Sequence, residues 1–234
     1  MTHPHPPSRP PLSRDVPITP GASAFLVIDV QNFCACPDGG EYRNLPAAAR
    51  EREYGAFFAR LETTTLPAIR RLQDACREAG IEVLFTVIES LTRDGRDRSL
   101  DYKITGFHVP RGSWDAQVVD AIRPLDDEIV LPKTSSNVFI STNIDYILRN
   151  LGVRHLIVAG VMTDQCVESA VRDACDLGYL VTLVPDACAA KTEDRHRNSL
   201  RAIAGYCRQR DSAELIAEIA ALCSGGGSGR GSEV

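Results

Sequence analysis

The chain has 234 residues, of which 44% are hydrophobic, and this length suits one large α/β domain better than two small ones. Its net charge of −5 gives no reason to expect a nucleic acid or an anionic membrane as a partner. A membrane-spanning helix needs about 18 consecutive apolar residues. The sequence has no such run, so we expect no transmembrane segment.

Both ends of the chain have compositions that are typical of disorder. Residues 1–20 carry many prolines, and residues 224–234 read SGGGSGRGSEV. We therefore expect disordered tails there and one folded domain over residues 21–223. The N-terminal stretch lacks the apolar core of a secretory signal, and a chain of this size does not require disulfides. We expect a cytoplasmic protein whose eight cysteines are mostly reduced.

Apolar runs and helical patterns alternate along the predicted domain. The runs that are typical of buried strands are 24–30, 81–88, 128–131, 155–159 and 180–184. The helical patterns are 66–79, 113–122, 143–151, 164–177, 194–206 and 211–222. Pro67 lies in the first turn of the first predicted helix, and Gly80 ends that helix. Apolar strands that alternate with helices predict an α/β fold, with a parallel sheet covered by helices on both faces.

Parallel sheets of this kind bind ligands beyond the carboxyl ends of their strands, so we look for site residues there. The residues at those positions are Asp29, Glu89, Lys133, the segment 161–166 and Asp186.

Cys166 follows a predicted strand and lies in the first turn of the next predicted helix. Unpaired backbone N–H groups and the helix dipole favour an anion there, so a thiol at this position ionises more easily. The same N–H groups are able to stabilise an oxyanion. The alternative is an ordinary core cysteine, because free cysteine is among the most buried residue types.

Asp29 and Lys133 also lie at strand ends, on the same edge of the predicted sheet as Cys166. Asp29 alone is equally consistent with a turn residue, and Lys133 alone with a solvated surface charge. An acid, a cation and a thiol that converge at one edge favour nucleophilic catalysis. The carboxylate would take the thiol proton, and the lysine would hold both partners in place and lower their pKa values.

Four segments resemble the isochorismatase-like cysteine hydrolases. They are LVIDVQNFC (26–34), GSWDAQVVD (112–120), IVLPKTSSNVF (129–139) and AGVMTDQCVESAVRDACDLGY (159–179). The resemblance extends over about residues 22–222, and the four segments occur in the family's order.

This resemblance implies a three-layer α/β/α fold with a six-stranded parallel sheet and an Asp–Lys–Cys triad at Asp29, Lys133 and Cys166. It implies a cis peptide bond between Val161 and Met162, and an oxyanion hole formed by the N–H groups of Met162 and Cys166. Members of the family often form dimers or tetramers, so we expect a homodimer or a homotetramer.

Two departures from family patterns narrow the prediction. Nicotinamidases carry an Asp-x-His metal motif after the second strand, whereas this chain has no histidine there before His108. Cys34 and Cys36 have no second Cys/His pair at ligand spacing, so we expect no metal and no other cofactor. Isochorismatases proper cleave a vinyl ether without a nucleophilic cysteine, so Cys166 argues against that reaction.

The predicted reaction is hydrolysis of a C–N bond in a small amide-like molecule, through a thioester on Cys166. The segments 112–120 and 129–133 resemble ureidoacrylate amidohydrolases most closely, which favours a ureido or carbamoyl substrate. The candidate substrate-binding residues are Asn32, Phe33, Arg93, Ser136 and Asn137, and a loop cation among Arg93, Lys103 and Arg111 is a candidate partner for a substrate carboxylate. We interpret Trp114, the only tryptophan, as an anchor of its own helix.

Two alternatives stay open. One is hydrolysis of a cyclic amide, as in streptothricin hydrolase. The other is a relative that binds a ligand without turning it over, although such a domain has no need for Asp29, Lys133 and Cys166 together.

Overall fold

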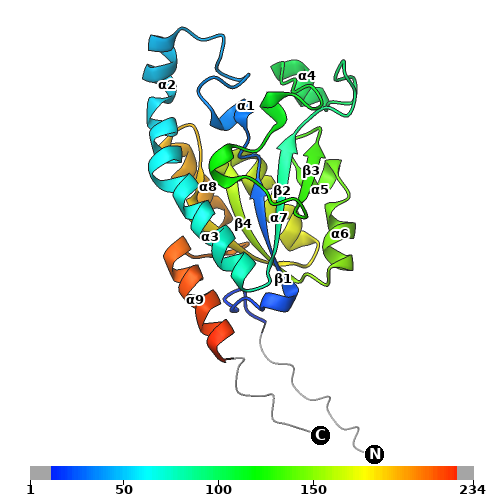
Figure 1. Cartoon of the computed structure of the whole chain (residues 1–234), viewed down its shortest axis with the longest axis vertical. Coiled ribbons are helices and arrows are strands. Elements are labelled where there is room, and N and C mark those ends of the chain that lie inside the picture. The colour runs from blue at the N-terminus through cyan, green and yellow to red at the C-terminus, as the bar shows by residue number, and fades with distance from the viewer. Residues whose placement is uncertain (1–11, 226–234) are drawn as a thin grey trace, which may run out of the picture.

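The computed structural model describes residues 12–225, and a six-stranded sheet lies at the centre of this part of the chain (Figure 1). Its strands are β1 (Ser23–Ile28), β2 (Glu82–Ile88), β3 (Ile129–Lys133), β4 (His155–Val161), β5 (Leu180–Ala189) and β6 (Arg208–Gln209). All neighbouring strands are parallel, in the order β3-β2-β1-β4-β5-β6. Every residue of β1 and β4 is buried, as expected for central strands with helices on both faces.

Helices cover both faces of the sheet, and two short helices, α1 (Asn32–Ala35) and α4 (Leu100–Thr105), lie at its carboxyl edge (Figure 1). The other α-helices of the described residues are α2 (Ala47–Arg60), α3 (Leu66–Glu78), α5 (Val138–Ser141), α6 (Ile144–Asn150), α7 (Glu168–Asp176), α8 (Glu193–Ile203) and α9 (Ser212–Gly225). α3 and α9 pack together on one face, and α5 to α8 lie on the other (Figure 1). The predicted three-layer α/β/α architecture with a six-stranded parallel sheet is confirmed. None of the helices in the described part of the chain is long and apolar enough to span a membrane.

The order of the strands reverses between β1 and β4, which are hydrogen-bonded neighbours. The chain leaves β1 towards β2 on one side and leaves β4 towards β5 on the other. The carboxyl edge at such a reversal is the position where open α/β sheets bind ligands. In Figure 1 this edge lies at the top of the sheet, near α1 and α4.

Several elements differ from their predictions. Residues 113–122 form two short 3-10 helices, Trp114–Ala116 and Asp120–Ile122, in place of one helix. β5 continues to Ala189, five residues beyond the predicted end at 184. α2, which the sequence analysis missed, runs through the π-helical turn Leu61–Thr65 into α3. Pro67, which has no backbone N–H to donate, lies in the first turn of α3 directly after this π-helical turn.

The predicted tails fall largely outside the described residues, because residues 1–11 and 226–234 are not among them. Within residues 12–20, Ile18 is buried and its N–H donates to a carboxylate oxygen of Glu218 on α9 at 2.9 Å. The disorder predicted for the outer ends stays a prediction.

Candidate active site

Three side chains from three strand ends meet at the carboxyl edge of the sheet. Asp29 follows β1, Lys133 ends β3, and Cys166 lies in the π-helical turn η5 (Thr163–Val167) that follows β4. The Lys133 Nζ atom lies 2.8 Å from the Asp29 Oδ2 atom and 3.4 Å from the Cys166 Sγ atom. The predicted convergence of acid, cation and thiol is therefore present in the structure.

The Asp29 carboxylate is held in a buried and polar corner. Asp29 has a φ of 54°, in the left-handed region that few residues other than glycine adopt. Its backbone N–H donates to the Thr86 carbonyl at 3.1 Å, and the Thr86 hydroxyl donates to Asp29 Oδ1 at 2.7 Å. These bonds orient the carboxylate and leave its Oδ2 atom to face the Lys133 ammonium.

Lys133 is fully buried, with none of its side chain exposed, and its ammonium group is surrounded by acceptors. Besides Asp29 and Cys166, Nζ donates to the Ser135 carbonyl at 2.8 Å and to the Tyr102 hydroxyl at 3.3 Å. Burial by itself lowers the pKa of this ammonium. The adjacent Asp29 carboxylate outweighs burial and leaves the pKa of Lys133 above its ordinary value, so the lysine is charged.

The Cys166 thiol is 6% exposed, and its sulfur lies 3.5 Å from the Ser136 hydroxyl. Burial raises the pKa of this thiol to about 11, although the nearby Lys133 ammonium acts in the opposite direction. The prediction that its place at a helix N-terminus makes the thiol ionise more easily is therefore wrong. The cost of desolvating a thiolate, together with the nearby Asp29 carboxylate, exceeds the stabilisation from the Lys133 ammonium.

The turn before Cys166 is tightly fixed. The peptide bond between Val161 and Met162 is cis, at the position that the resemblance implies. Thr163 begins η5, and α8 holds it at two points. The His196 Nδ1 atom lies 2.8 Å from the Thr163 hydroxyl, and the Ser199 hydroxyl donates to the Thr163 carbonyl at 3.1 Å.

Asp29 and Cys166 open onto a cavity of about 310 Å³ at this edge of the sheet. Its other lining residues are Cys34, Glu41, Ile88, Asp101, Tyr102, Thr105, Phe107, Ser136, Val161, Met162 and Gln165. A volume of this size suits a small molecule, and the buried thiol and carboxylate lie on its floor.

The sequence profile of the isochorismatase domain matches residues 23–214 of this chain. The chain belongs to the isochorismatase family. It is 31% identical over 193 residues to the ureidoacrylate amidohydrolase RutB of Rhizobium rhizogenes, covering 75% of this chain and 74% of that protein.

Two solved structures support the same assignment for this isochorismatase-family hydrolase. A cysteine hydrolase from Pseudomonas syringae pv. phaseolicola has a TM-score of 0.74 and 26% identity, covering 92% of this chain and 99% of that one. The N-carbamoylsarcosine amidase from Thermoplasma acidophilum has a TM-score of 0.62 and 26% identity, covering 81% of this chain and 96% of that one.

Of the predicted substrate-binding residues in this isochorismatase-family hydrolase, Ser136 lines the cavity and the other four do not. The Asn32 side chain donates to the Trp114 carbonyl at 2.9 Å, and Phe33 packs edge-on against Phe107. The Asn137 side chain accepts a hydrogen bond from the Phe139 N–H at the start of α5. These contacts give three of the residues structural roles beside the cavity.

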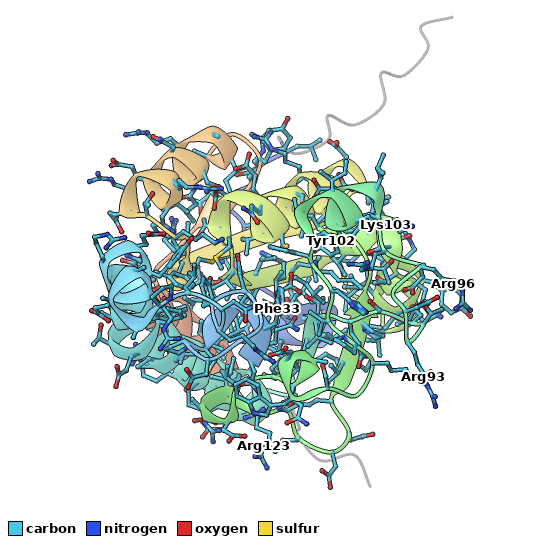
Figure 2. All side chains as sticks on the ribbon, turned by 90° about the horizontal axis from the view of Figure 1, so that it is seen from above. Phe33, Arg93, Arg96, Tyr102, Lys103 and Arg123 are labelled. Atoms are coloured by element: carbon cyan, nitrogen blue, oxygen red, sulfur yellow. The ribbon has the colours of Figure 1, made fainter. Side chains whose placement is uncertain are left out.

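Arg93, the fifth candidate, is exposed and points away from the centre of the molecule, whereas Phe33 lies near the middle of the same view (Figure 2). Lys103 and Arg111 are also exposed, and neither lines the cavity. The predicted role of a loop cation in binding a substrate carboxylate therefore finds no support in these positions.

Two further strand-end residues have structural partners. Glu89 accepts a hydrogen bond from the Gly112 N–H at 2.7 Å, and Asp186 accepts one from the Ser212 N–H at the start of α9 at 2.8 Å.

Within residues 12–225, no group of three or more His, Cys, Asp and Glu side chains is arranged to hold a metal ion. The predicted absence of a metal and of any other cofactor stays a prediction.

Tyr102 and Phe107 line the cavity, but the sequence analysis assigned no element to the polar stretch that contains them. The signals of α4 were nevertheless present. The Ser99 hydroxyl caps the helix by accepting from the Tyr102 N–H, and Gly106 ends it with a φ of 77°.

Gln31 was also missed. It is fully buried, donates to the Ile88 and Asp115 carbonyls at 2.9 Å each, and accepts from the Ile88 N–H at 2.5 Å. These bonds join the segment after β1 to Ile88 at the end of β2 and to the loop at Asp115, and only the fold reveals them.

Proposed function

We propose that this isochorismatase-family protein is a cysteine amidohydrolase that cleaves a C–N bond in a small ureido, carbamoyl or amide substrate. The observation that carries the proposal is the contact of the Cys166 thiol with the fully buried Lys133–Asp29 pair on the floor of a cavity. A buried charge pair beside a thiol is costly to desolvate and is typical of a functional site.

In the proposed first step, the Cys166 sulfur attacks the substrate carbonyl carbon while its proton moves to Asp29. The negative charge develops on the carbonyl oxygen, which the backbone N–H groups of Met162 and Cys166 stabilise. The C–N bond then breaks, Asp29 returns the proton to the departing nitrogen, and a thioester remains on Cys166.

In the second step, Asp29 accepts a proton from water, and the resulting hydroxide attacks the thioester carbonyl. The C–S bond breaks, the acid product leaves, and the proton on Asp29 returns to the Cys166 sulfur. Lys133 stays charged throughout, because its pKa is raised, and it neutralises whichever partner carries the negative charge.

The raised pKa of Cys166 fits this scheme. Because the thiol is neutral at rest with a pKa of about 11, attack requires a base within reach, and Asp29 is the base beside it.

The names of the relatives, a ureidoacrylate amidohydrolase and an N-carbamoylsarcosine amidase, support a ureido or carbamoyl group as the part that is cleaved. The homodimer or homotetramer and the cytoplasmic location stay predictions.

Replacement of Cys166 by alanine tests the proposal. We expect Cys166→Ala to lower turnover by about a thousandfold or more, because the covalent intermediate is lost. Purified protein is screened against ureido acids, primary amides, imides and lactams, with ammonia release and acid formation followed for each compound. Mass spectrometry of the wild-type protein, quenched during turnover, should show the acyl group on Cys166.

Cys76→Ala is the matched control, because Cys76 is a buried thiol on α3 that does not line the cavity. It should keep wild-type turnover. Full activity of Cys166→Ala on a substrate that the wild-type protein hydrolyses would show that another group is the nucleophile. Binding of ligands without any hydrolysis would favour a non-catalytic ligand-binding protein.

A further inference from the structure

The charges around the cavity are unevenly compensated. On the floor, Asp29 is paired with Lys133. On the wall, Glu41 is paired with Lys191, whose ammonium also lies over the rings of Tyr42 and Tyr54 at 5.8 and 5.5 Å from their centroids. Lys191 itself does not line the cavity. Each of these two carboxylates therefore has its own cation.

Asp101, at the mouth of the cavity, has no such cation. It lies in the first turn of α4, is exposed, and forms no ion pair with any residue of the described chain. Of the charged side chains that line the cavity, Asp29, Glu41 and Asp101, all three are acidic, and the charge of Asp101 is the uncompensated one. The side chains that line the cavity therefore carry one unpaired negative charge, that of Asp101.

Aromatic rings stand next to this carboxylate. Tyr102 and Phe107 both line the cavity, and their ring centroids are 5.5 Å apart. The Lys133 ammonium already lies over the Tyr102 ring, 5.9 Å from its centroid, so Phe107 is the one of the two rings that no cation of the described residues covers. The faces of aromatic rings attract cations through their quadrupole, and they attract them more strongly where water is excluded. A carboxylate at the mouth and aromatic rings in the wall are complementary to a positively charged organic group.

We infer that the substrate of this cavity carries a cationic substituent, an ammonium or guanidinium group, in addition to the amide-like group that is cleaved. The inference rests on the proposed function for the identity of the cleaved bond. In the proposed arrangement, the carbonyl group reaches Cys166 on the floor and the cationic group lies between Asp101 and the ring of Phe107, on the far side of Tyr102 from Lys133.

A substrate with a cationic substituent differs in charge from the compound in the name of the ureidoacrylate amidohydrolase relative. Ureidoacrylate, in the name of that relative, is itself a carboxylate. A substrate carboxylate in this cavity would approach the like charge of Asp101. The two lysines near the cavity already form ion pairs, Lys133 with Asp29 and Lys191 with Glu41. The exposed loop cations Arg93, Lys103 and Arg111 do not line the cavity.

The test measures how the charge of a small thiol reagent affects the rate at which it reaches Cys166. It does not need the natural substrate. The full chain is treated at low ionic strength with cationic trimethylammonioethyl methanethiosulfonate or with anionic sulfonatoethyl methanethiosulfonate. Mass spectrometry follows the rate of modification at Cys166. Each rate is divided by the rate of the same reagent with a small free thiol, which removes the intrinsic difference between the reagents.

We expect the normalised rate to be roughly threefold or more higher for the cationic reagent, and high salt to reduce this preference. Asp101→Asn should lower the preference by roughly threefold. Asp126→Asn is the matched control, because it removes the same charge from an exposed loop position that does not line the cavity, and it should leave the preference unchanged.

Equal rates, a faster anionic reagent, or an Asp101→Asn variant with an unchanged preference would overturn the inference. These outcomes are distinct from failure of the proposed function. If the protein hydrolyses amides but Cys166 reacts faster with the anionic reagent, the inference of a cationic substrate is rejected and the proposed function stands. A cationic preference at Cys166 together with no hydrolysis of any amide would reject the proposed function alone.

Discussion

The contact between Lys133 and Asp29 joins two charges that are both removed from water. Their side chains are 0% and 1% exposed, and the oxygen–nitrogen distance is 2.8 Å. Desolvation of a lone charge at this depth costs several kcal/mol. The attraction between the two charges offsets this cost for both residues. The pair is consequently a structural element as well as a proposed part of catalysis, and stability measurements can separate the two roles.

Lys133→Met should lower the free energy of unfolding by about 3 kcal/mol or more, because it leaves the Asp29 carboxylate buried without its cation. Asp29→Asn should also destabilise the protein, because it leaves the ammonium unpaired. The double variant should be less destabilised than the sum of the two single variants. Urea unfolding of the wild type and the three variants measures this, and additive losses would show that the pair does not interact.

At the level of elements, the site depends on how closely β1 and β4 approach each other. Gly160, near the end of β4, has a φ of 127° and lies directly against β1. A Cβ atom at this position would stand 2.1 Å from the Ile28 carbonyl oxygen. The register of β4 with β5 also shifts between Val158 and Gly160. This glycine therefore allows Asp29 and the turn that carries Cys166 to lie side by side.

Gly160→Ala should destabilise the protein by about 4 kcal/mol or more, because the new Cβ atom clashes with backbone and not with a movable side chain. Gly178→Ala is the matched control. Gly178 also has a positive φ, of 93°, but a Cβ atom there would meet nothing within 4 Å. It should cost only about 1 kcal/mol. Thermal unfolding compares the two variants, and equal losses would rule out the close approach as the cause.

At the scale of the whole molecule, two buried polar networks join separate elements of the fold. His155, at the start of β4, lies 2.8 Å from the Thr182 hydroxyl, which accepts from Arg208 at 3.0 Å. Arg208 forms two hydrogen bonds with Glu218 on α9, at 2.8 and 2.9 Å. His196 lies in a second network, between Thr163 and the guanidinium of Arg60.

Stability should fall in mild acid because of the two buried histidines. Burial and, second, the nearby arginines lower the pKa of His155 and of His196 from 6.5 to about 4. Between these values the unfolded chain binds more protons than the folded one, so the stabilisation is present above pH 6.5 and is lost as the pH falls towards 4.

Thermal unfolding midpoints across this pH range measure the effect. His155→Gln should make the midpoint less dependent on pH, because glutamine does not titrate. A midpoint that stays constant or rises as the pH falls would contradict the assignment of neutral, buried histidines.

The layers of this protein and the three central side chains of its site follow from patterns in the amino-acid sequence. Apolar strands followed by helices leave few folds other than a covered parallel sheet, and strand ends in such a sheet share one edge. Asp29, Lys133 and Cys166 could therefore be placed together without coordinates. Short elements such as α4 were missed, because their caps are weak signals within a polar stretch.

Tertiary structure alone decided the ionisation of the thiol and the lining of the cavity. The pKa of Cys166 depends on how much water the fold removes, and no local pattern reports that. Glu41, Asp101 and Phe107 reach the cavity from separate loops and helices, whereas Asn32 and Arg93, which the sequence favoured, do not line it. Neighbours in sequence diverge at the end of a strand, and the charge of the cavity is set by residues that only folding brings together.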